Sequence, residues 1–196
     1  MRSIYLVLDM VNDLVAEDGP NGKTPLGQQV RGRGIIAKTQ TAIQRARAAD
    51  VPIGFVRVGF SSDYRECPAT SAIFSGARQH GLFKLGTKGT EVHADLAPRP
   101  GDFDIVKHRV SPFYGTSLEP ILRAHRIERI VLSGVSSVAV VQATVREAHD
   151  RDYVCVVLED CCAAATAEDH AAAIAVLQRF ATFTTAAEVD FAGKAG

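Results

Sequence analysis

Residues 130–148, which read IVLSGVSSVAVVQATVREA, place the strongest constraint on the fold of this chain. The segment opens with the pattern of a buried strand, turns sharply at Gly134 and Val135, and continues as a helix that starts at Ser136 or Ser137. Such a turn directs backbone N–H groups, and the positive end of the helix dipole, at whatever lies above the end of the strand. The sequence therefore predicts a strand–helix unit with a binding site at the turn.

Other short apolar runs alternate with helical patterns along the rest of the chain. We expect strands at residues 4–9, 52–58, 103–107, 129–133 and 153–158, with a short sixth one within 181–189. We expect helices at residues 35–49, 116–125, 137–151 and 167–180. Alternation of this kind is typical of an α/β fold whose parallel sheet has right-handed crossovers and helices on both faces.

Two segments lack a clear pattern. Residues 10–34 are rich in glycine and proline and are interpreted as loops, and residues 59–101 show only possible helical turns around 69–80. An irregular segment as long as 59–101 is more often functional than not. It could form the wall or lid of a substrate pocket, or equally a plain surface excursion or an oligomer contact.

Composition restricts the class of protein. The chain has 196 residues, 46% of them hydrophobic, which suits a single globular domain over residues 1–196. Its 22 basic residues balance 22 acidic ones, so neither nucleic acid nor an anionic membrane is an expected partner. The four cysteines form no CxxC pair, and neither a signal peptide nor an apolar run of membrane-spanning length is seen, so we expect a reduced, cytoplasmic protein.

Two charged residues stand at the ends of predicted strands. Asp9 ends the first strand and Lys107 the third. In a parallel sheet both would lie at the carboxyl edge, beside the turn after residue 133, where open α/β sheets bind ligands. Asp9 is a candidate general acid or base, and a structural role is its alternative. A lysine in this position is expected to face a carboxylate, and pairing with Lys107 would hold Asp9 ionised, which suits a base better than an acid.

Several familiar sites are missing from the sequence. It has no GxGxxG or Walker phosphate loop, no GxSxG elbow and no HExxH metal motif. We therefore expect neither a cofactor nor a metal ion.

Three blocks resemble the isochorismatase-like cysteine hydrolase superfamily. They are LVLDMVND at residues 6–13, VKHRVSPFYGTSL at 106–118 and the segment at 130–148, which continues through Asp160. The resemblance implies a Rossmann-like, three-layer α/β/α fold with a mostly parallel sheet of about six strands, assembled as a homodimer or homotetramer. It also implies a catalytic set of aspartate, lysine and cysteine, in which Asp9 and Lys107 match the first two.

The third member of that set is absent. The block around the nucleophile usually reads GVxTxxCV, which places the cysteine at position 140, where this chain has Val140. Valine can form no acyl-enzyme. The resemblance further suggests a cis peptide bond between Val135 and Ser136, amides of residues 137–140 that bind a developing anion, and substrate contacts from Ser136, Ser137 and Phe113; helix capping is the alternative role for the two serines.

Three functional hypotheses follow. The first is a hydrolase that cleaves an amide or enol-ether bond of a small polar metabolite by non-covalent acid/base chemistry, as isochorismatases proper do without the cysteine. The second is a non-catalytic relative that keeps a binding site or an oligomer surface. The third moves the nucleophile to another thiol, that of Cys67, Cys161 or Cys162. Cys161 and Cys162 follow the fifth strand and could line the site, but packing is their expected role, as it is for Cys155 within that strand.

Overall fold

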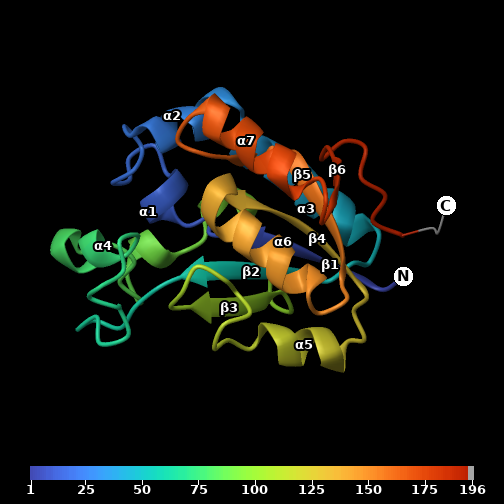
Figure 1. Ribbon diagram of the computed structural model, residues 1–196, viewed down its shortest axis with the longest axis horizontal. Helices are drawn as coiled ribbons and strands as arrows, with labels where there is room; N and C mark the ends of the chain where they lie inside the picture. Colours follow the sequence, from blue (N-terminus) through green and yellow to red (C-terminus); the bar gives the residue numbers. More distant parts are fainter. Residues whose placement is uncertain (194–196) are drawn as a thin grey trace.

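Six parallel strands form the central sheet of the computed structural model, which describes residues 1–193 (Figure 1). The last three residues of the predicted domain lie outside the described part. The strands are β1 (Ser3–Leu8), β2 (Ile53–Val58), β3 (Phe103–Lys107), β4 (Arg129–Val135), β5 (Val154–Ala163) and β6 (Thr182–Thr184). Their order in the sheet is β3-β2-β1-β4-β5-β6, so the order reverses between β1 and β4. The predicted α/β class and parallel sheet are confirmed.

Helices cover both faces of the sheet. They are α1 (Asn12–Val15), α2 (Pro25–Gly32), α3 (Ile35–Ala48), α4 (Ser75–His80), α5 (Leu118–Ala124), α6 (Gln142–His149) and α7 (Ala167–Leu177). One-turn 3-10 helices, η1 (Lys88–Thr90) and η2 (Ala94–Leu96), precede β3, and a π-helical turn, η3 (Ser137–Val141), leads into α6. No helix within residues 1–193 is long and apolar enough to cross a membrane.

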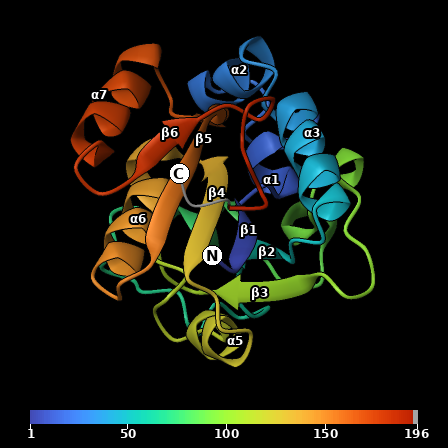
Figure 2. The ribbon, with the colours of Figure 1, turned by 90° about the vertical axis from the view of Figure 1, so that its right-hand side faces the viewer.

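The alternating side chains of β1 define the two layers of the core. Tyr5 and Val7 pack in the cluster that contains α3, whereas Ile4, Leu6 and Leu8 pack with α5 and α6. All five are at most 1% exposed, so β1 is buried on both faces, as its continuous apolar run predicts. Figure 2 shows α3 on one side of the strands and α5 and α6 on the other.

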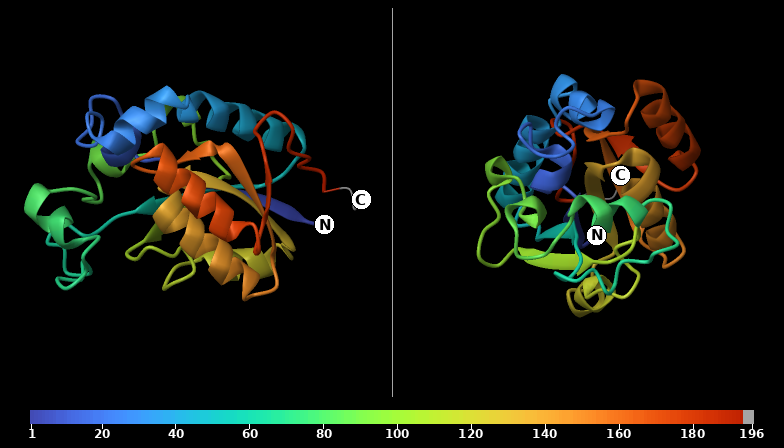
Figure 3. Two further views of the ribbon diagram at one scale, coloured as in Figure 1. Left: turned by 45° about the horizontal axis from the view of Figure 1, so that its top comes forward. Right: turned by 90° about the vertical axis from the view of Figure 1, so that its left-hand side faces the viewer.

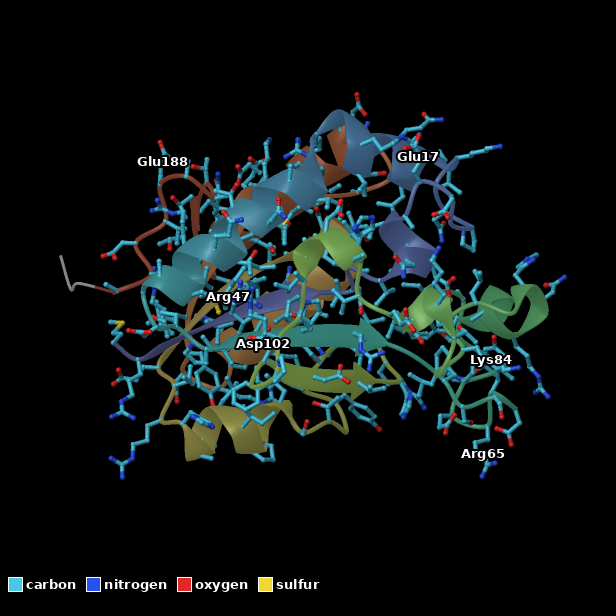
Figure 4. All side chains as sticks on the ribbon, turned by 180° about the vertical axis from the view of Figure 1, so that it is seen from behind. Glu17, Arg47, Arg65, Lys84, Asp102 and Glu188 are labelled. Atoms are coloured by element: carbon cyan, nitrogen blue, oxygen red, sulfur yellow. The ribbon has the colours of Figure 1, made fainter. Side chains whose placement is uncertain are left out.

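An ion pair ties the segment before β3 to the α3 layer. Arg47 of α3 lies 2.7 Å from Asp102, and Figure 4 shows these two labelled side chains next to each other on the rear face. Arg47 also donates to the carbonyl of Ala97, at 3.2 Å. Both charged groups are largely buried, so the pair fixes where the long irregular segment returns to the sheet.

The expectation of loops throughout residues 10–34 is wrong, because the segment contains α1 and α2. Thr24 caps α2, its hydroxyl accepting a hydrogen bond from the Gly27 amide at 3.4 Å, and Pro25 is the first helical residue. A threonine followed by proline is a helix-start signal. The neighbouring glycines hid that signal in the sequence.

Strand β5 extends five residues beyond its predicted end. Leu132 pairs with Val157 while Gly134 pairs with Cys162, so a bulge on β5 takes up the extra residues and the pairing with β4 then resumes. Cys161 and Cys162 therefore lie within the strand, fully buried, and not beyond its end. The acidic residues Glu159 and Asp160 at the bulge made the strand look shorter than it is.

Residues 59–101 cover the carboxyl edge of the sheet. Their helical part is α4, which agrees with the turns predicted near residues 69–80. The right-hand view in Figure 3 looks onto this edge, and α4 and its flanking loops lie in front of the strands. The segment is thus placed where it can close over a site at the strand ends.

Candidate active site

A cavity of about 280 Å³ lies at the carboxyl edge of the sheet. Its polar lining consists of Asp9 after β1, Lys107 at the end of β3, Ser136 after β4, and Asn21 from the segment between α1 and α2. The rest of its lining is apolar. The predicted convergence of an acid, an amine and a chain turn is therefore present, although the apolar walls differ from what a small polar substrate led us to expect.

Asp9 and Lys107 form a buried ion pair. Asp9 Oδ2 lies 2.8 Å from Lys107 Nζ, with side chains only 7% and 2% exposed. The other carboxylate oxygen accepts a hydrogen bond from the Val58 amide at 2.8 Å, and the ammonium also donates to the Arg109 carbonyl at 3.0 Å. Asp9 has a φ of 55°, a left-handed conformation that aspartate tolerates better than most residues and that turns the chain at the end of β1. The pair is thus held by β1, β2 and the loop after β3.

Burial and charge act in opposite directions on Asp9. Burial raises the pKa of this carboxyl above its ordinary value, while the Lys107 ammonium and the hydrogen bond from Val58 act to lower it. Burial has the larger effect, so the expectation that Lys107 holds the carboxyl of Asp9 ionised gives way to a raised pKa. A carboxyl whose pKa is raised retains its proton to a higher pH than an exposed aspartate and is better suited to donate it.

Val140 lines the same cavity as the ion pair. It is 2% exposed, lies in η3, and packs with the core cluster of α5 and α6. The peptide bond between Val135 and Ser136 is cis, as the resemblance suggested. An aliphatic side chain therefore faces the Asp9–Lys107 cavity at the position where the resemblance places a thiol.

Ser137, in contrast, is not among the residues that line the cavity, so the structure does not bring its side chain to the site. It is fully buried, and its hydroxyl is 2.7 Å from Nδ1 of His170 in α7. Nε2 of His170 is 2.6 Å from Glu159, whose carboxylate is 2.6 Å from Arg33. Ser136 occupies the N-cap position of η3, as the capping alternative expected, but its side chain accepts no capping hydrogen bond, and Ser137 lies inside the turn.

The network of Ser137, His170, Glu159 and Arg33 was missed in the sequence; its first two members are buried and the other two are partly exposed. Its members come from η3, α7, β5 and the end of α2, and no spacing along the chain connects them. Only the three-dimensional fold reveals it. Because Ser137 is the neighbour of Ser136, the network fixes the turn that forms one wall of the cavity.

Ser137→Ala is expected to lower the free energy of unfolding by about 1–3 kcal/mol, because Nδ1 of the buried His170 loses its partner. Ser137→Thr keeps the hydroxyl and should retain most of the stability. Urea denaturation of both variants measures the difference. Equal stability of the alanine variant and the wild type would contradict a structural role for this hydrogen bond.

The amides of residues 137–140 are not all available to a ligand. The Ala139 amide donates to the Ser136 carbonyl at 3.2 Å, and the Val141 amide donates to the same oxygen at 3.3 Å. Of the four amides, that of Ala139 is thus engaged within the turn. An anion site built from all four amides, as expected from the resemblance, is not what the geometry provides.

Phe113 is not among the residues that line the cavity, so the structure does not bring it to the site either. Its ring stacks on Tyr153 with centroids 6.3 Å apart, and the guanidinium of Arg151 lies 4.7 Å from its centroid. Both partners lie in the loop between α6 and β5. Phe113 stabilises that side of the core and is not among the residues that line the site.

The segment 59–101 supplies a wall of the cavity, in agreement with its interpretation as the wall or lid of a substrate pocket. Its contribution is apolar and includes Phe74, Leu82 and Phe83. Asp13 of α1, itself buried, accepts a hydrogen bond from the Phe83 amide at 2.7 Å. Phe83 has a φ of 57°, a strained conformation for a bulky residue, and the Asp13 anchor helps to hold it there.

The native thiols are poorly placed for nucleophilic chemistry. Burial raises the pKa of Cys155 and of Cys162 to about 12 and also raises that of Cys161. Cys67 is half-buried, its sulfur 3.5 Å from the Phe74 carbonyl, and it does not line the cavity. Within residues 1–193, no three His, Cys, Asp or Glu side chains are grouped so that they could hold a metal ion.

Comparison with known proteins identifies the family of this chain. Residues 3–188 match the isochorismatase domain family. The isochorismatase family protein YecD of Escherichia coli O157:H7 is 34% identical over 137 residues, which are 69% of this chain and 70% of YecD.

Solved structures share the fold. An isochorismatase family protein from Desulfovibrio vulgaris subsp. vulgaris str. Hildenborough superposes with a TM-score of 0.84 over 95% of each chain, at 24% identity. The N-carbamoylsarcosine amidase of Thermoplasma acidophilum superposes with a TM-score of 0.75 over 97% of this chain and 99% of its own, at 26% identity. This chain belongs to the isochorismatase family.

Proposed function

We propose that this chain is a hydrolase that cleaves a small molecule by non-covalent acid/base catalysis, with Asp9 as the proton donor or acceptor. The observation that carries the proposal is the buried Asp9–Lys107 pair in the wall of a cavity that Val140 also lines. A paired carboxyl with a perturbed pKa in a cleft is a strong candidate for proton transfer. Members of the family are hydrolases, which sets the reaction class.

Water takes the place of the missing nucleophile in this mechanism. Val140 has neither a proton nor a lone pair to offer, so no covalent intermediate forms at that position. Asp9 either protonates the leaving group or activates the attacking water. A carboxyl whose pKa is raised by burial suits the first of these roles.

Lys107 has two roles in the proposal. It holds Asp9 in place, and an ammonium has three N–H donors, of which Asp9 and the Arg109 carbonyl take two. The third would donate to an oxygen of the substrate. The bond cleaved is a C–N amide bond, for which the similarity to N-carbamoylsarcosine amidase is an argument, or the C–O bond of an enol ether.

A non-catalytic binding protein is the second candidate function. The observation that favours it is the packing of Val140, which is 2% exposed and joins the core cluster of α5 and α6. Such packing is expected of a core residue, in a relative that no longer uses this position for covalent catalysis. Such a protein would keep the cavity and bind its ligand without cleaving it.

Turnover of a panel of amides and enol ethers by the wild type and by Asp9→Asn tests the proposal. The variant is expected to lose at least about 100-fold in kcat/KM, the usual contribution of a positioned acid or base. Asp18→Asn is the matched control, because Asp18 is 78% exposed and lies outside the cavity. Equal rates in the wild type and Asp9→Asn would reject Asp9 as the acid/base. No turnover by the wild type, with a panel compound still raising the Tm, would favour the binding protein.

We also propose a cytoplasmic location and a homodimeric or homotetrameric assembly. The four cysteines are free thiols, which suits a reducing compartment. The assembly is inferred from the family resemblance.

A further inference from the structure

We propose that the site binds an uncharged ligand, with a compact hydrocarbon body and one neutral polar head such as a carboxamide. The proposal rests on the proposed function for the location of the site and adds the chemical class of the ligand. Three observations carry it: the charge balance of the lining, its apolar walls and the size of the cavity.

The lining contains one cation and one anion, and these two are paired. Lys107 Nζ is 2.8 Å from Asp9 and also donates to the Arg109 carbonyl. The guanidinium of Arg109 is itself engaged, donating to the carbonyls of Glu66 and His108. A ligand carboxylate in the cavity would lose its hydration without gaining an unpaired cation, and a ligand cation would gain no unpaired anion. A neutral ligand avoids both costs.

Apolar side chains from two parts of the chain form the walls. Val135 and Val140 come from the β4–η3 turn, and Phe74 and Leu82 come from the long segment before β3. Ile73 lines the cavity as well and is 56% exposed, so it contributes to the rim. Burial of a hydrocarbon body against such walls removes apolar surface from water and so favours binding. A polyhydroxylated or multiply charged body would gain no binding free energy from them.

The cavity volume limits the body of the ligand. At about 280 Å³ it lies just below the range of roughly 300–1,000 Å³ that is typical of sites for drug-sized molecules. A single ring therefore suits the site better than a fused system. The four polar residues of the lining can serve one head group, since a carboxamide offers both an acceptor for Lys107 and donors for Ser136 or Asp9.

A matched pair of probes tests the charge preference without any turnover. Cyclohexanecarboxamide and cyclohexanecarboxylate have the same shape and differ in charge near neutral pH. Isothermal titration is expected to give the amide a Kd of about 1 mM or lower and the carboxylate at least about a tenfold weaker one. Acetamide, which has the head but no body, should also bind at least about tenfold more weakly. A carboxylate or acetamide that binds as tightly as the ring amide, or a ring amide that does not bind, would overturn the proposal.

A cation introduced at the rim should change this preference. Ile73→Lys is expected to tighten binding of cyclohexanecarboxylate by at least about tenfold and to leave that of the amide within about threefold. Val176→Lys is the control, because Val176 is similarly exposed, at 47%, but lies on α7 outside the cavity. An unchanged carboxylate affinity in Ile73→Lys would contradict charge as the determinant.

These results separate this proposal from the proposed function. If Asp9→Asn retains full turnover while the ring amide still binds preferentially, the acid/base role fails and the ligand class stands. If Asp9 is needed for turnover but the carboxylate binds best, only the ligand class fails.

Discussion

Replacing Val140 by cysteine is expected to give this chain a fast-reacting thiol. Position 140 lines the cavity, lies in the first turn before α6, and shares the site with Lys107. The positive end of the helix and the ammonium both favour a thiolate, so the pKa of the new thiol should fall below the value of about 8.5 of a free cysteine. Iodoacetamide, a small uncharged amide, can enter the cavity and report the rate of alkylation.

The Val140→Cys experiment requires that no native thiol reacts with iodoacetamide, and it requires a control cysteine at a neighbouring position. Cys155 and Cys162 have pKa values raised to about 12 and should remain silent, and Cys67→Ser removes the one half-buried thiol. Val141→Cys, also combined with Cys67→Ser, is the control, because Val141 is fully buried and does not line the cavity. Val140→Cys should be alkylated at least about tenfold faster than this control. A slow thiol of ordinary pKa would mean that the site no longer activates a nucleophile.

A low pKa in Val140→Cys would also bear on the reaction. Amide hydrolysis through an acyl-enzyme needs only the thiol in addition to the Asp9–Lys107 pair that is already present. Gain of amidase activity would then show that this chain differs from the thiol hydrolases at one position. A reactive thiol without amidase activity would instead mean that this chain also differs from the thiol hydrolases in how it binds substrate.

The site was predictable from the sequence to the extent that it depends on strand ends. Asp9, Lys107 and the turn after β4 follow short apolar runs, and a parallel sheet brings the ends of such runs to one edge. The ion pair between Asp9 and Lys107 followed from the rarity of an unpaired buried lysine. These inferences needed only the order of the elements.

The direction of individual side chains was not predictable in the same way. Ser137 is next to a cavity residue in the sequence, but its hydroxyl turns to His170, a residue from a helix 33 positions later. Phe113 follows β3 closely, but it stacks on Tyr153, from the loop between α6 and β5. In both cases the contacting residue comes from a distant part of the chain. No local sequence pattern at residue 113 or 137 indicates in which direction the side chain points.

The buried pair itself gives the largest expected effect on stability. Lys107→Met leaves the Asp9 carboxyl buried without its cation and is expected to lower the free energy of unfolding by about 3–5 kcal/mol at neutral pH. Burial already raises the pKa of Asp9, and loss of the lysine removes the main opposing influence, so the pKa rises further. Guanidinium denaturation of the wild type and the variant measures the loss.

The pH dependence of the Lys107→Met loss identifies its cause. A carboxyl whose pKa is higher in the folded than in the unfolded chain favours folding at low pH, and this contribution is lost as the pH rises through the folded pKa. The deficit of Lys107→Met should therefore shrink as the pH is lowered from about 8 to about 5, because Asp9 becomes protonated and no longer needs a cation. A deficit that is constant over this range would mean that lost packing, and not an unpaired charge, destabilises the variant.

Removing the second charge should reverse most of the Lys107→Met effect. Asn at position 9 keeps an oxygen for the Val58 amide, so the double variant Asp9→Asn/Lys107→Met is expected to be more stable near neutral pH than Lys107→Met alone. Lys88→Met is the control, because its pair with Asp18 is 3.4 Å long and more than three-quarters exposed, and its loss should cost less than about 1 kcal/mol. If the double variant is no more stable than the single one, the Asp9–Lys107 pair is not the coupled unit on which the proposed proton transfer depends.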